Sequence, residues 1–405
     1  MGKIKAKNPI VEMNGDEMTR IIWDMIKQKL ILKHLDLNLM EFDLGMESRE
    51  ATGDQITIDA ANAIGEIKVG VKCATITPDD DRVREFKLTK QWKSPNGTIR
   101  NILKGTIFRK PIMVKNIKPF VRTWKKPIVI GRHAFGDLYR SVEYRVSEPG
   151  RTDLKFTPAS NPDKPVRVKM FDFHSPGIIM GMHNTDESIR IFAKNCIAYA
   201  IDQKIDLWFS VKDTISKIYH ARFRDIFAQE YEAVKEQFSK LGIEYRFLLI
   251  DDAVAQIMKK DGGVVWALRN YDGDVMSDMV AAGFGSLGMM TSVLVSPTGA
   301  FEYEAAHGTV KRHYHQHKKG NVTSTNSVAS IFAWTGALRK RGELDNTPEL
   351  MDFADKLEEA VIENIEQGIA TKDLLPLMEP QPSEHQTTEG FIDHVAAKLE
   401  EKLAG

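Results

Sequence analysis

The chain has 405 residues, of which 42% are hydrophobic and 28% are charged, and its 56 Lys and Arg residues equal its 56 Asp and Glu residues in number. At roughly 150 residues per domain, this length predicts two or three domains with a sizeable core. Because the formal net charge is zero, the chain has no overall electrostatic attraction to nucleic acid or to an anionic membrane surface, and we expect neither as a partner.

The cysteines and the apolar runs narrow the class of protein further. Cys73 and Cys196 are the two cysteines, too few for a disulfide framework or a thiolate metal cage, which fits a reducing compartment and predicts a cytoplasmic protein. No apolar run approaches the ~20 residues of a membrane-spanning helix, and the charged first residues lack the apolar stretch of a signal peptide.

Strand and helix patterns alternate through the first third of the chain. The spacing of apolar residues predicts strands at 10–13, 37–44 and 69–74, and helices at 18–32 and 57–67. Asp16 stands where a residue could cap the first helix. This alternation is typical of an α/β domain.

The middle of the chain changes character and then returns to the same pattern. Between 139 and 168, residues alternate with period two, which predicts antiparallel strands with turns at 149–150 and 161–163. The α/β pattern resumes with a helix at 187–204, strands at 207–211 and 245–249, and a long charged helix at 224–240.

The last part of the chain is predicted to be helical. One helix begins at Thr347–Pro348, where Pro suits the first turn, and the last is an amphipathic helix at 391–403. No repeat, low-complexity tract or flexible linker divides the chain, so we expect interleaved domains.

Two motif matches fail on context. Gly283 to Gly288 fits the dinucleotide fingerprint G-x-G-x-x-G, but it follows a helix-like stretch and precedes a strand-like one, which predicts a helix-to-strand loop and no Rossmann fold. His313, His315 and His317 could hold a metal along a strand face. We favour a solvated or phosphate-facing loop, because the neighbouring Lys and Arg residues would repel a cation.

Acidic residues form the first candidate site. Asp274 and Asp278 lie four residues apart, and on a helix they would share one face, while Asp251 and Asp252 follow a predicted strand. Clustered carboxylates select Mg²⁺ or Mn²⁺. The alternative is a solvated helix N-terminus, where Asp is favoured in any case.

Arginines form the second candidate site. Arg100, Arg109 and Arg132 each lie near a Gly or a turn-like segment, and three converging guanidinium groups would suit a polycarboxylic acid. The alternative is three unrelated surface arginines.

The third candidate is the segment 304–313, followed by 324–326. Its small residues would let backbone N–H groups approach a ligand, and its Lys, Arg and His residues suit a phosphate. A nucleotide site and an ordinary basic loop both fit this composition.

Taken together, these sequence segments resemble those of the NADP-dependent, homodimeric, eukaryote-like isocitrate dehydrogenases of the β-decarboxylating dehydrogenase family. The matching runs are Gly15 to Trp23, Val69 to Pro78, Trp92 to Leu103, Ile130 to Ala134, Tyr271 to Val275, Ser286 to Val295, and Glu304 to Val310. The similarity extends from about Val11 to Asp373. Leu138 and Phe135 depart from the family pattern, which expects Gln and Tyr there.

The resemblance implies the family's own α/β fold, with a large domain, a small domain and an antiparallel clasp. It places the large domain at 1–103 and 284–405, the small domain at 104–136 and 186–283, and the clasp at 137–185. It also implies oxidative decarboxylation of isocitrate to 2-oxoglutarate with NADP in the tricarboxylic acid cycle, and a homodimer with shared active sites.

The resemblance also implies a set of site residues. Isocitrate would be held by Thr77, Ser94, Asn96, Arg100, Arg109 and Arg132. Mg²⁺ or Mn²⁺ would be held by Asp274 and Asp278 of one subunit and Asp251 of the other. Lys212, also from the partner, would act as general base and Tyr139 as proton donor. NADP would be held by Lys72, Thr75, Arg82, Asn96, Gln256, Lys259, Gly308, Thr309, Val310, Arg312, His313, Thr325 and Asn326, with Arg312, His313 and Lys259 reading the 2′-phosphate.

Two other functions stay open at this point. A paralogous enzyme acting on an isopropyl- or homo-analogue of isocitrate would need an apolar residue in place of Ser94 and Asn96. A ligand-binding or RNA-associated protein with a dead site would lack an acid, Arg or Lys from the set, and none is missing.

Overall fold

The structure, a computed structural model, describes residues 2–404 and divides the chain into two compact units. One unit comprises residues 2–135 and 186–404, and the other comprises residues 136–185. The predicted boundaries between a large and a small domain stay predictions.

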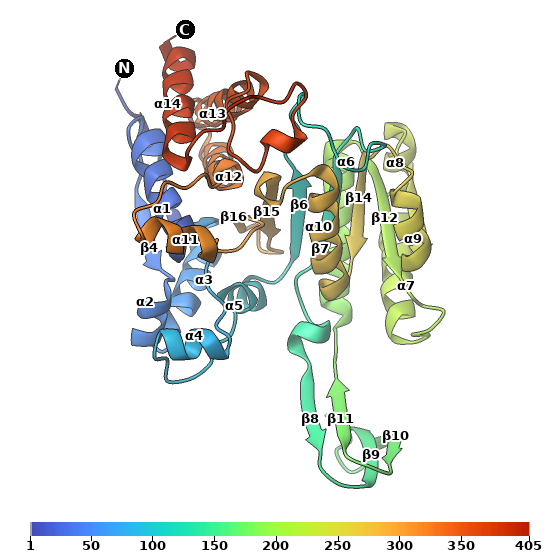
Figure 1. Cartoon of the computed structure of the whole chain (residues 1–405). Helices are drawn as coiled ribbons and strands as arrows, with labels where there is room; N and C mark the ends of the chain where they lie inside the picture. The colour runs from blue at the N-terminus through green and yellow to red at the C-terminus, as the bar shows by residue number, and fades with distance from the viewer. Residues whose placement is uncertain (1, 405) are drawn as a thin grey trace. The chain divides into compact units, whose positions relative to one another are not determined.

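A ten-stranded sheet forms the framework of the first unit (Figure 1). Its order is β13-β12-β14-β7-β6-β15-β16-β5-β2-β4. Neighbouring strands are parallel, except that β6 runs antiparallel to β7 and β15, and β15 antiparallel to β16. The strands are β2 (Ile10–Asn14), β4 (Leu39–Asp43), β5 (Val69–Lys72), β6 (Thr106–Pro111), β7 (Ile128–His133), β12 (Asp206–Val211), β13 (Tyr245–Leu249), β14 (Val264–Leu268), β15 (Met290–Val295) and β16 (Phe301–Ala305). The α/β prediction is confirmed.

Helices cover both faces of this sheet, and the two faces can be read from the alternation of side chains along a strand. On β6, Ile107 packs with the cluster of α3 (Gln55–Ile67) and α5 (Pro95–Leu103), whereas Phe108 packs on the other face with α6 (Asp186–Gln203) and α7 (Tyr219–Glu232). Arg109 therefore points to the same face as Ile107.

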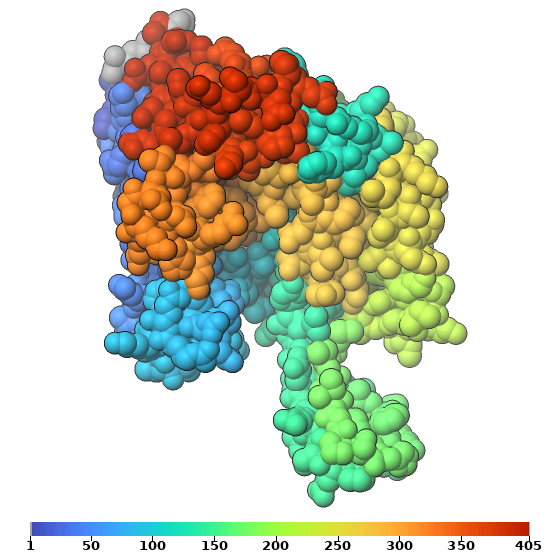
Figure 2. Space-filling model, viewed as in Figure 1, coloured from blue at the N-terminus to red at the C-terminus, as the bar shows by residue number. Residues whose placement is uncertain are grey.

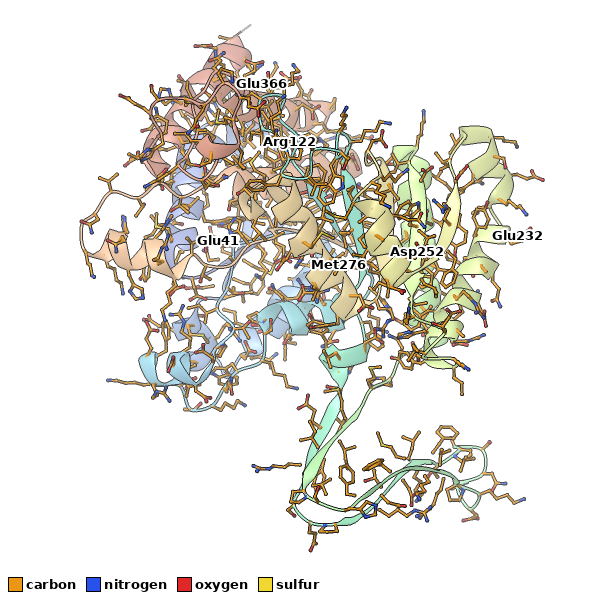
Figure 3. All side chains as sticks on the ribbon, turned by 45° about the vertical axis from the view of Figure 1, so that its right-hand side comes forward. Glu41, Arg122, Glu232, Asp252, Met276 and Glu366 are labelled. Carbon is orange, nitrogen blue, oxygen red and sulfur yellow. The ribbon has the colours of Figure 1, made fainter. Side chains whose placement is uncertain are left out.

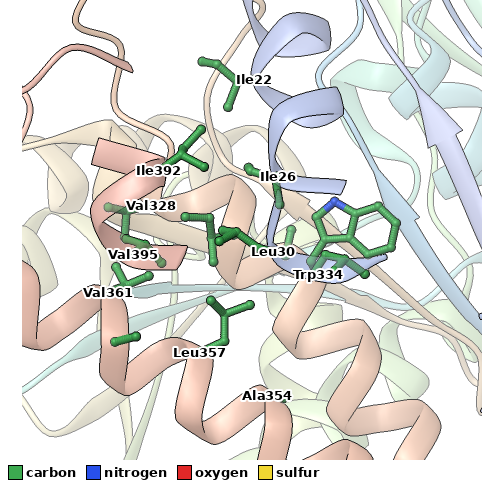
Figure 4. Packing of buried hydrophobic residues seen from close by; sticks show 14 of the residues in the cluster. Ile22, Ile26, Leu30, Val328, Trp334, Ala354, Leu357, Val361, Ile392 and Val395 are labelled. Carbon is green, nitrogen blue, oxygen red and sulfur yellow. The ribbon is translucent and has the colours of Figure 1, made fainter. Parts of the chain in front are cut away.

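The largest apolar cluster joins both ends of the chain (Figure 4). Helix α1 (Glu17–Ile26) and the π-helix Lys27–Ile31 that follows it pack against α12 (Val328–Asp345), α13 (Pro348–Glu366) and α14 (Thr388–Ala404). Leu30 and Trp334, which are completely buried, belong to this cluster. The remaining helices of this unit are α2 (Met46–Ala51), α4 (Asp80–Glu85), α8 (Lys235–Leu241), α9 (Ile250–Ile257), α10 (Asn270–Phe284) and α11 (Lys311–Lys318). Two short strands, β1 (Ile4–Lys5) and β3 (Leu35–Asp36), pair with each other.

The second unit consists of two antiparallel pairs, as the period-two pattern predicts. Strand β8 (Val142–Val146) pairs with β11 (Gly177–Gly181), and β9 (Gly150–Phe156) pairs with β10 (Val166–Phe173). Apolar side chains such as Val142, Tyr144 and Ile178 are exposed on these strands.

Most predicted elements are confirmed, including a helix-to-strand connection at 283–288. There α10 ends at Phe284, Gly285 has a φ of 124° that favours glycine, and a 3₁₀-helix spans Leu287–Met289 before β15. Three predictions are wrong. The stretch with His313, His315 and His317, for which we favour a loop over a strand face, is the helix α11. The charged helix at 224–240 is broken into α7 and α8, because Tyr231 and Phe238 turn inward and their rings pack at 5.3 Å. Asp16 makes no capping bond; its carboxylate instead accepts from the backbone N–H groups of Met46 and Ile76, both at 2.8 Å. No helix within residues 2–404 is long and apolar enough to cross a membrane.

Candidate active site

Two buried arginines meet one carboxylate at the face of the sheet covered by α10. Arg109 on β6 and Arg132 on β7 point to the same face, because the register pairs Arg109 with Ile130 and Arg132 with Ile107. A guanidinium N–H of Arg132 donates to Asp274, and Nη1 of Arg109 lies 3.4 Å from Oδ1 of the same residue. Arg109 and Arg132 therefore converge on one carboxylate, which the sequence alone left open against unrelated surface arginines.

Helix α10 can lie this close to β7 because residue 273 is glycine. A Cβ at Gly273 would lie 2.8 Å from the Cβ of Arg132, closer than side chains tolerate. The Nε of Arg132 also donates to Oδ1 of Asn270 at 3.0 Å, and Nη1 of Arg109 donates to Oγ of Ser277 at 2.6 Å. Four contacts to one helix thus fix both guanidinium groups.

Asp278 lies one helical turn beyond Asp274 and shares its face, as the spacing predicts. Its Oδ1 is 3.9 Å from Nη1 of Arg109. Burial raises the pKa of Asp278, the charge of Asp274 adds to this, and Arg109 opposes it. Two carboxylates that repel each other in this way suit a divalent cation with hard oxygen ligands.

A second charged group lies across the same face of the sheet. Glu304 on β16 is in register with Ser292 on β15, which pairs with Arg109 on β6. Nη2 of Arg100 donates to Oε1 of Glu304 at 3.1 Å, and Nζ of Lys72 lies 3.7 Å from Oε2. Burial opposes the ionisation of Glu304, but Lys72 and Arg100 outweigh it and lower its pKa.

Glu302 lies two residues before Glu304 and points to the same face. Burial, with the charge of Glu304 adding to it, raises the pKa of Glu302 to about 8. Its Oε1 is one of several buried polar atoms near this face that have no hydrogen-bond partner among residues 2–404, together with Oδ1 of Asn96, Nε of Arg109, Oγ of Ser292 and Nε2 of His307. Buried polar groups are rarely left unpaired, so this concentration fits a polar ligand or water.

Lys212 and Asp251 form a separate ion pair of 2.6 Å. They meet because Lys212 follows β12 and Asp251 lies in the first turn of α9 after β13, the parallel neighbour of β12. The bond to Lys212 lowers the pKa of Asp251.

Strands β14 and β7 separate the Lys212–Asp251 pair from β6 in the sheet order. Within residues 2–404, no group of three His, Cys, Asp or Glu residues could hold a metal, so one chain does not bring Asp251 to Asp274 and Asp278. Figure 3 labels Asp252 on α9 and Met276 on α10.

Two of the predicted nucleotide residues, Arg312 and His313, lie on α11 beside a cavity. A cavity of about 440 Å³ is lined by Arg312, His313, Gln316, Val322, Thr323, Ser324, Lys372, Asp373 and His385. Nδ1 of His313 is 2.7 Å from Oγ1 of Thr325, and burial, with Arg312 nearby, lowers the pKa of His313. Figure 2 shows the surface hollowed between α11 and α10.

This cavity also shows what sequence reasoning missed. Lys372, Asp373 and His385 belong to its lining, and Asp373 accepts from Nδ2 of Asn326 at 3.0 Å. These residues lie after the long helix α13, and no motif connects them with segment 304–326. Lys259 does not line this cavity; it lies two residues beyond the end of α9, the helix that carries Asp251.

The other predicted residues are distributed over several elements. Gln256 lies on α9, and Asn96 lies on α5. Oγ1 of Thr75 accepts from Nζ of Lys72 at 3.2 Å, and Gly308 and Val310 flank Thr309 before α11. Arg82 and Thr309 both contact Glu17. Thr77 is exposed in the loop after β5, and Ser94 stands at the N-terminus of α5. Tyr139 belongs to the unit 136–185, in the 3₁₀-helix Asp137–Arg140, and is 46% exposed.

Comparison with known proteins gives a consistent result. A family model described as isocitrate/isopropylmalate dehydrogenase matches residues 5–395. A Candida tropicalis protein named isocitrate dehydrogenase [NADP], mitochondrial, is 57% identical over 98% of this chain and 93% of its own length. A Mycobacterium tuberculosis (strain H37Rv) protein named isocitrate dehydrogenase [NADP] 1 is 54% identical over 99% of this chain and 98% of its own length. A Sphingobium yanoikuyae protein named isocitrate dehydrogenase [NADP] is 52% identical over 100% of this chain and 99% of its own length.

Proposed function

The chain belongs to the isocitrate/isopropylmalate dehydrogenase family, and we propose that it oxidatively decarboxylates isocitrate to 2-oxoglutarate and CO₂ while reducing NADP⁺ to NADPH. The observation that carries this proposal is the meeting of Arg109 and Arg132 with Asp274 and Asp278. That arrangement places carboxylate-binding groups beside candidate metal ligands.

The substrate site would use the three arginines as carboxylate receptors. Arg109 and Arg132 are both buried, and a guanidinium group in such a place binds a planar carboxylate through two parallel hydrogen bonds. Arg100, held by Glu304, faces the same region. Thr77, Ser94 and Asn96 complete the proposed set, and the polar Ser94 and Asn96 favour a third carboxylate over an isopropyl group.

The residues present fit a divalent metal ion. Asp274 and Asp278 offer hard oxygen ligands on one helix face, and Asp251 of a second subunit would complete the set. When bound, Mg²⁺ or Mn²⁺ supplies Lewis-acid stabilisation of negative charge on the substrate oxygens. Arg109 and Arg132 hold the carboxylate of Asp274 in place, which would keep this proposed metal ligand oriented when the metal ion binds.

Proton transfer would depend on Lys212 and Tyr139. Lys212 would accept the proton of the substrate hydroxyl, directly or through Asp274, and Tyr139 would return a proton after loss of CO₂. NADP⁺ accepts the hydride when bound. Nζ of Lys212 lies 2.6 Å from Oδ2 of Asp251, so the two residues would enter a shared site together.

The dinucleotide would occupy the region of α11. Arg312 and His313 line one cavity, and with Lys259 they would form the reader of the 2′-phosphate, in which Arg312 supplies positive charge and His313 a hydrogen bond. Such a set favours NADP over NAD, whose sites usually present an acid to the ribose hydroxyl. Lys72, Thr75, Arg82, Gln256, Gly308 to Val310, Thr325 and Asn326 complete the proposed contacts.

We propose a homodimer that shares its active sites. Lys212 and Asp251 form one pair, so a chain could donate both residues together to its partner. Ile215 and Ile218, close to Lys212 in the chain, are 78% and 88% exposed, which is typical of apolar residues at an interface.

We also propose a cytoplasmic location, because Cys73 and Cys196 are both free and buried, as is usual in a reducing compartment. Microscopy of a tagged protein in its own cell tests this location.

Two experiments test the function and the shared site. Product analysis should find one 2-oxoglutarate and one CO₂ per NADPH with isocitrate, and turnover only with an isopropyl analogue would refute the substrate. For the shared site, Lys212→Met and Arg132→Gln are each expected to be inactive, whereas dimers reassembled from the mixture should regain about a quarter of parental sites. No recovery in reassembled dimers would place each site within one chain.

A further inference from the structure

Glu17, the first residue of α1, has an unusual backbone conformation. Its φ is 55°, in the left-handed region that a residue with a Cβ rarely adopts. Conformations of this kind persist where the surrounding structure fixes them, and they cluster at ligand sites. The side chain of Glu17 is only 3% exposed, so its carboxylate needs partners within the protein.

Both carboxylate oxygens of Glu17 are used, and their partners come from two distant segments. Oε1 accepts from Nη2 of Arg82 on α4 at 2.7 Å. Oε2 accepts from Oγ1 of Thr309, in the segment that precedes α11. One buried carboxylate therefore connects α4 and the segment before α11, each of which carries a proposed dinucleotide residue; we call these two segments the walls of the proposed site.

A second connection between these walls is weaker. Nη1 of Arg82 donates to Oε2 of Glu85 at 2.9 Å, and Nζ of Lys311 lies 3.4 Å from the same oxygen. The side chains of Glu85 and Lys311 are 40% and 46% exposed, so water and salt weaken this link. Glu17 is the buried link of the two.

The residues before Glu17 explain why its conformation is retained. A Cβ at Gly15 would lie 2.0 Å from the carbonyl oxygen of Ala74, so only glycine permits this approach. Asp16 then accepts from the backbone N–H groups of Ile76 and Met46, both at 2.8 Å. These contacts tie the backbone before α1 to the start of α2 and to the loop after β5, which leads to α4.

We propose that Glu17 is a positioning residue of the dinucleotide site, which holds the Arg82 guanidinium and the Thr309 hydroxyl at fixed places on these two walls. This inference rests on the proposed function. Because Thr309 gives its single hydroxyl proton to Glu17, its oxygen faces any ligand as an acceptor. Arg82 has five N–H donors and gives one to each carboxylate, so donors remain for an anionic group such as a phosphate.

Two substitutions separate positioning from folding. Glu17→Gly removes the carboxylate and relieves the backbone, because glycine adopts a φ of 55° without strain. Glu17→Gln keeps the shape and one oxygen acceptor. Glu12→Gln is the matched control, since Glu12 is a buried carboxylate on β2 that pairs with Lys27 at 2.9 Å and is absent from the proposed site.

The measurement is steady-state kinetics with NADP⁺ and isocitrate varied separately. For Glu17→Gly we expect the KM for NADP⁺ to rise about tenfold or more, with kcat and the KM for isocitrate within about threefold of the parent. Glu17→Gln should lie between, and Glu12→Gln should leave the KM for NADP⁺ unchanged. Equal increases in both KM values, or an unchanged KM for NADP⁺ in Glu17→Gly, would overturn the proposal.

A double-mutant cycle tests whether Glu17 acts through Thr309. Thr309→Val should weaken NADP⁺ binding in the parent, but by a smaller factor when Glu17 is already glycine. Full additivity would contradict the coupling. A parent protein without NADP⁺-dependent turnover would refute the proposed function itself, whereas an active parent with unaffected Glu17 variants would refute only the positioning role.

Discussion

Asp274→Asn tests the centre of the candidate site. The substitution keeps the side-chain volume and one oxygen acceptor but removes the charge that Arg132 and Arg109 share. A charge-assisted hydrogen bond contributes about 1 to 2 kcal/mol more than a neutral one. Because the side chain of Asp274 is 39% exposed and Asp278 lies 3.9 Å from Arg109, we expect a loss of about 1 kcal/mol in unfolding free energy.

The effect on turnover should be much larger than the effect on stability. Losing one of the proposed metal ligands and the anionic partner of two arginines should lower kcat/KM by about a hundredfold or more. The assay combines urea unfolding, size-exclusion chromatography and initial rates across a range of Mg²⁺ concentrations. The apparent affinity for Mg²⁺ should fall as well.

Asp272→Asn provides the matched control on the same helix. Asp272 pairs with Arg269 at 3.0 Å and has no role in the proposed site, so this variant should lose a similar amount of stability and little activity. Full turnover in Asp274→Asn, or an equal loss in Asp272→Asn, would refute the assignment of Asp274 as a metal ligand.

Three further predictions follow from particular contacts. Gly273→Ala should lower the unfolding free energy by roughly 1 to 3 kcal/mol, because the new Cβ would lie 2.8 Å from the Cβ of Arg132. Gly65→Ala, whose nearest contact would be at 3.9 Å, should leave the unfolding free energy nearly unchanged, and urea unfolding measures both variants. Burial raises the pKa of Glu302 in the folded state to about 8, so the unfolding free energy of the parent should fall as the pH rises from the ordinary pKa of Glu to about 8. The expected slope is about 1.4 kcal/mol per pH unit where only the unfolded state is ionised. Glu302→Gln should flatten this pH dependence, and an unchanged slope in the variant would contradict the buried proton. Arg312→Ala should raise the KM for NADP⁺ more than the KM for NAD⁺, and equal increases in the two would remove Arg312 from the 2′-phosphate reader.

The sequence predicted the elements well because hydrophobic periodicity is a local property. The helix at 57–67 and the strand at 245–249 are confirmed almost to the residue. The sheet order could not be predicted, since the antiparallel placement of β6 between β7 and β15 depends on contacts between residues far apart in the chain. Likewise, nothing local reveals that Phe238 turns inward and divides the charged helix.

In the candidate site too, features set by local spacing were predicted and features set by contacts between distant residues were not. The spacing of Asp274 and Asp278 predicted a shared helix face, and the resemblance predicted Arg109 and Arg132 beside them. Neither pattern pointed to Glu17, because its role depends on Arg82 and Thr309, 65 and 292 residues away in sequence. The lining of the α11 cavity by Lys372 was missed for the same reason.

The most direct test of the proposed function is the absorbance of NADPH formed by the purified protein with isocitrate and Mg²⁺. Parallel reactions contain NAD⁺ in place of NADP⁺, or EDTA. The proposal predicts a rate that depends on NADP⁺, is much lower with NAD⁺ and is abolished by EDTA. No rate with either cofactor, while the protein is folded and dimeric, would contradict it.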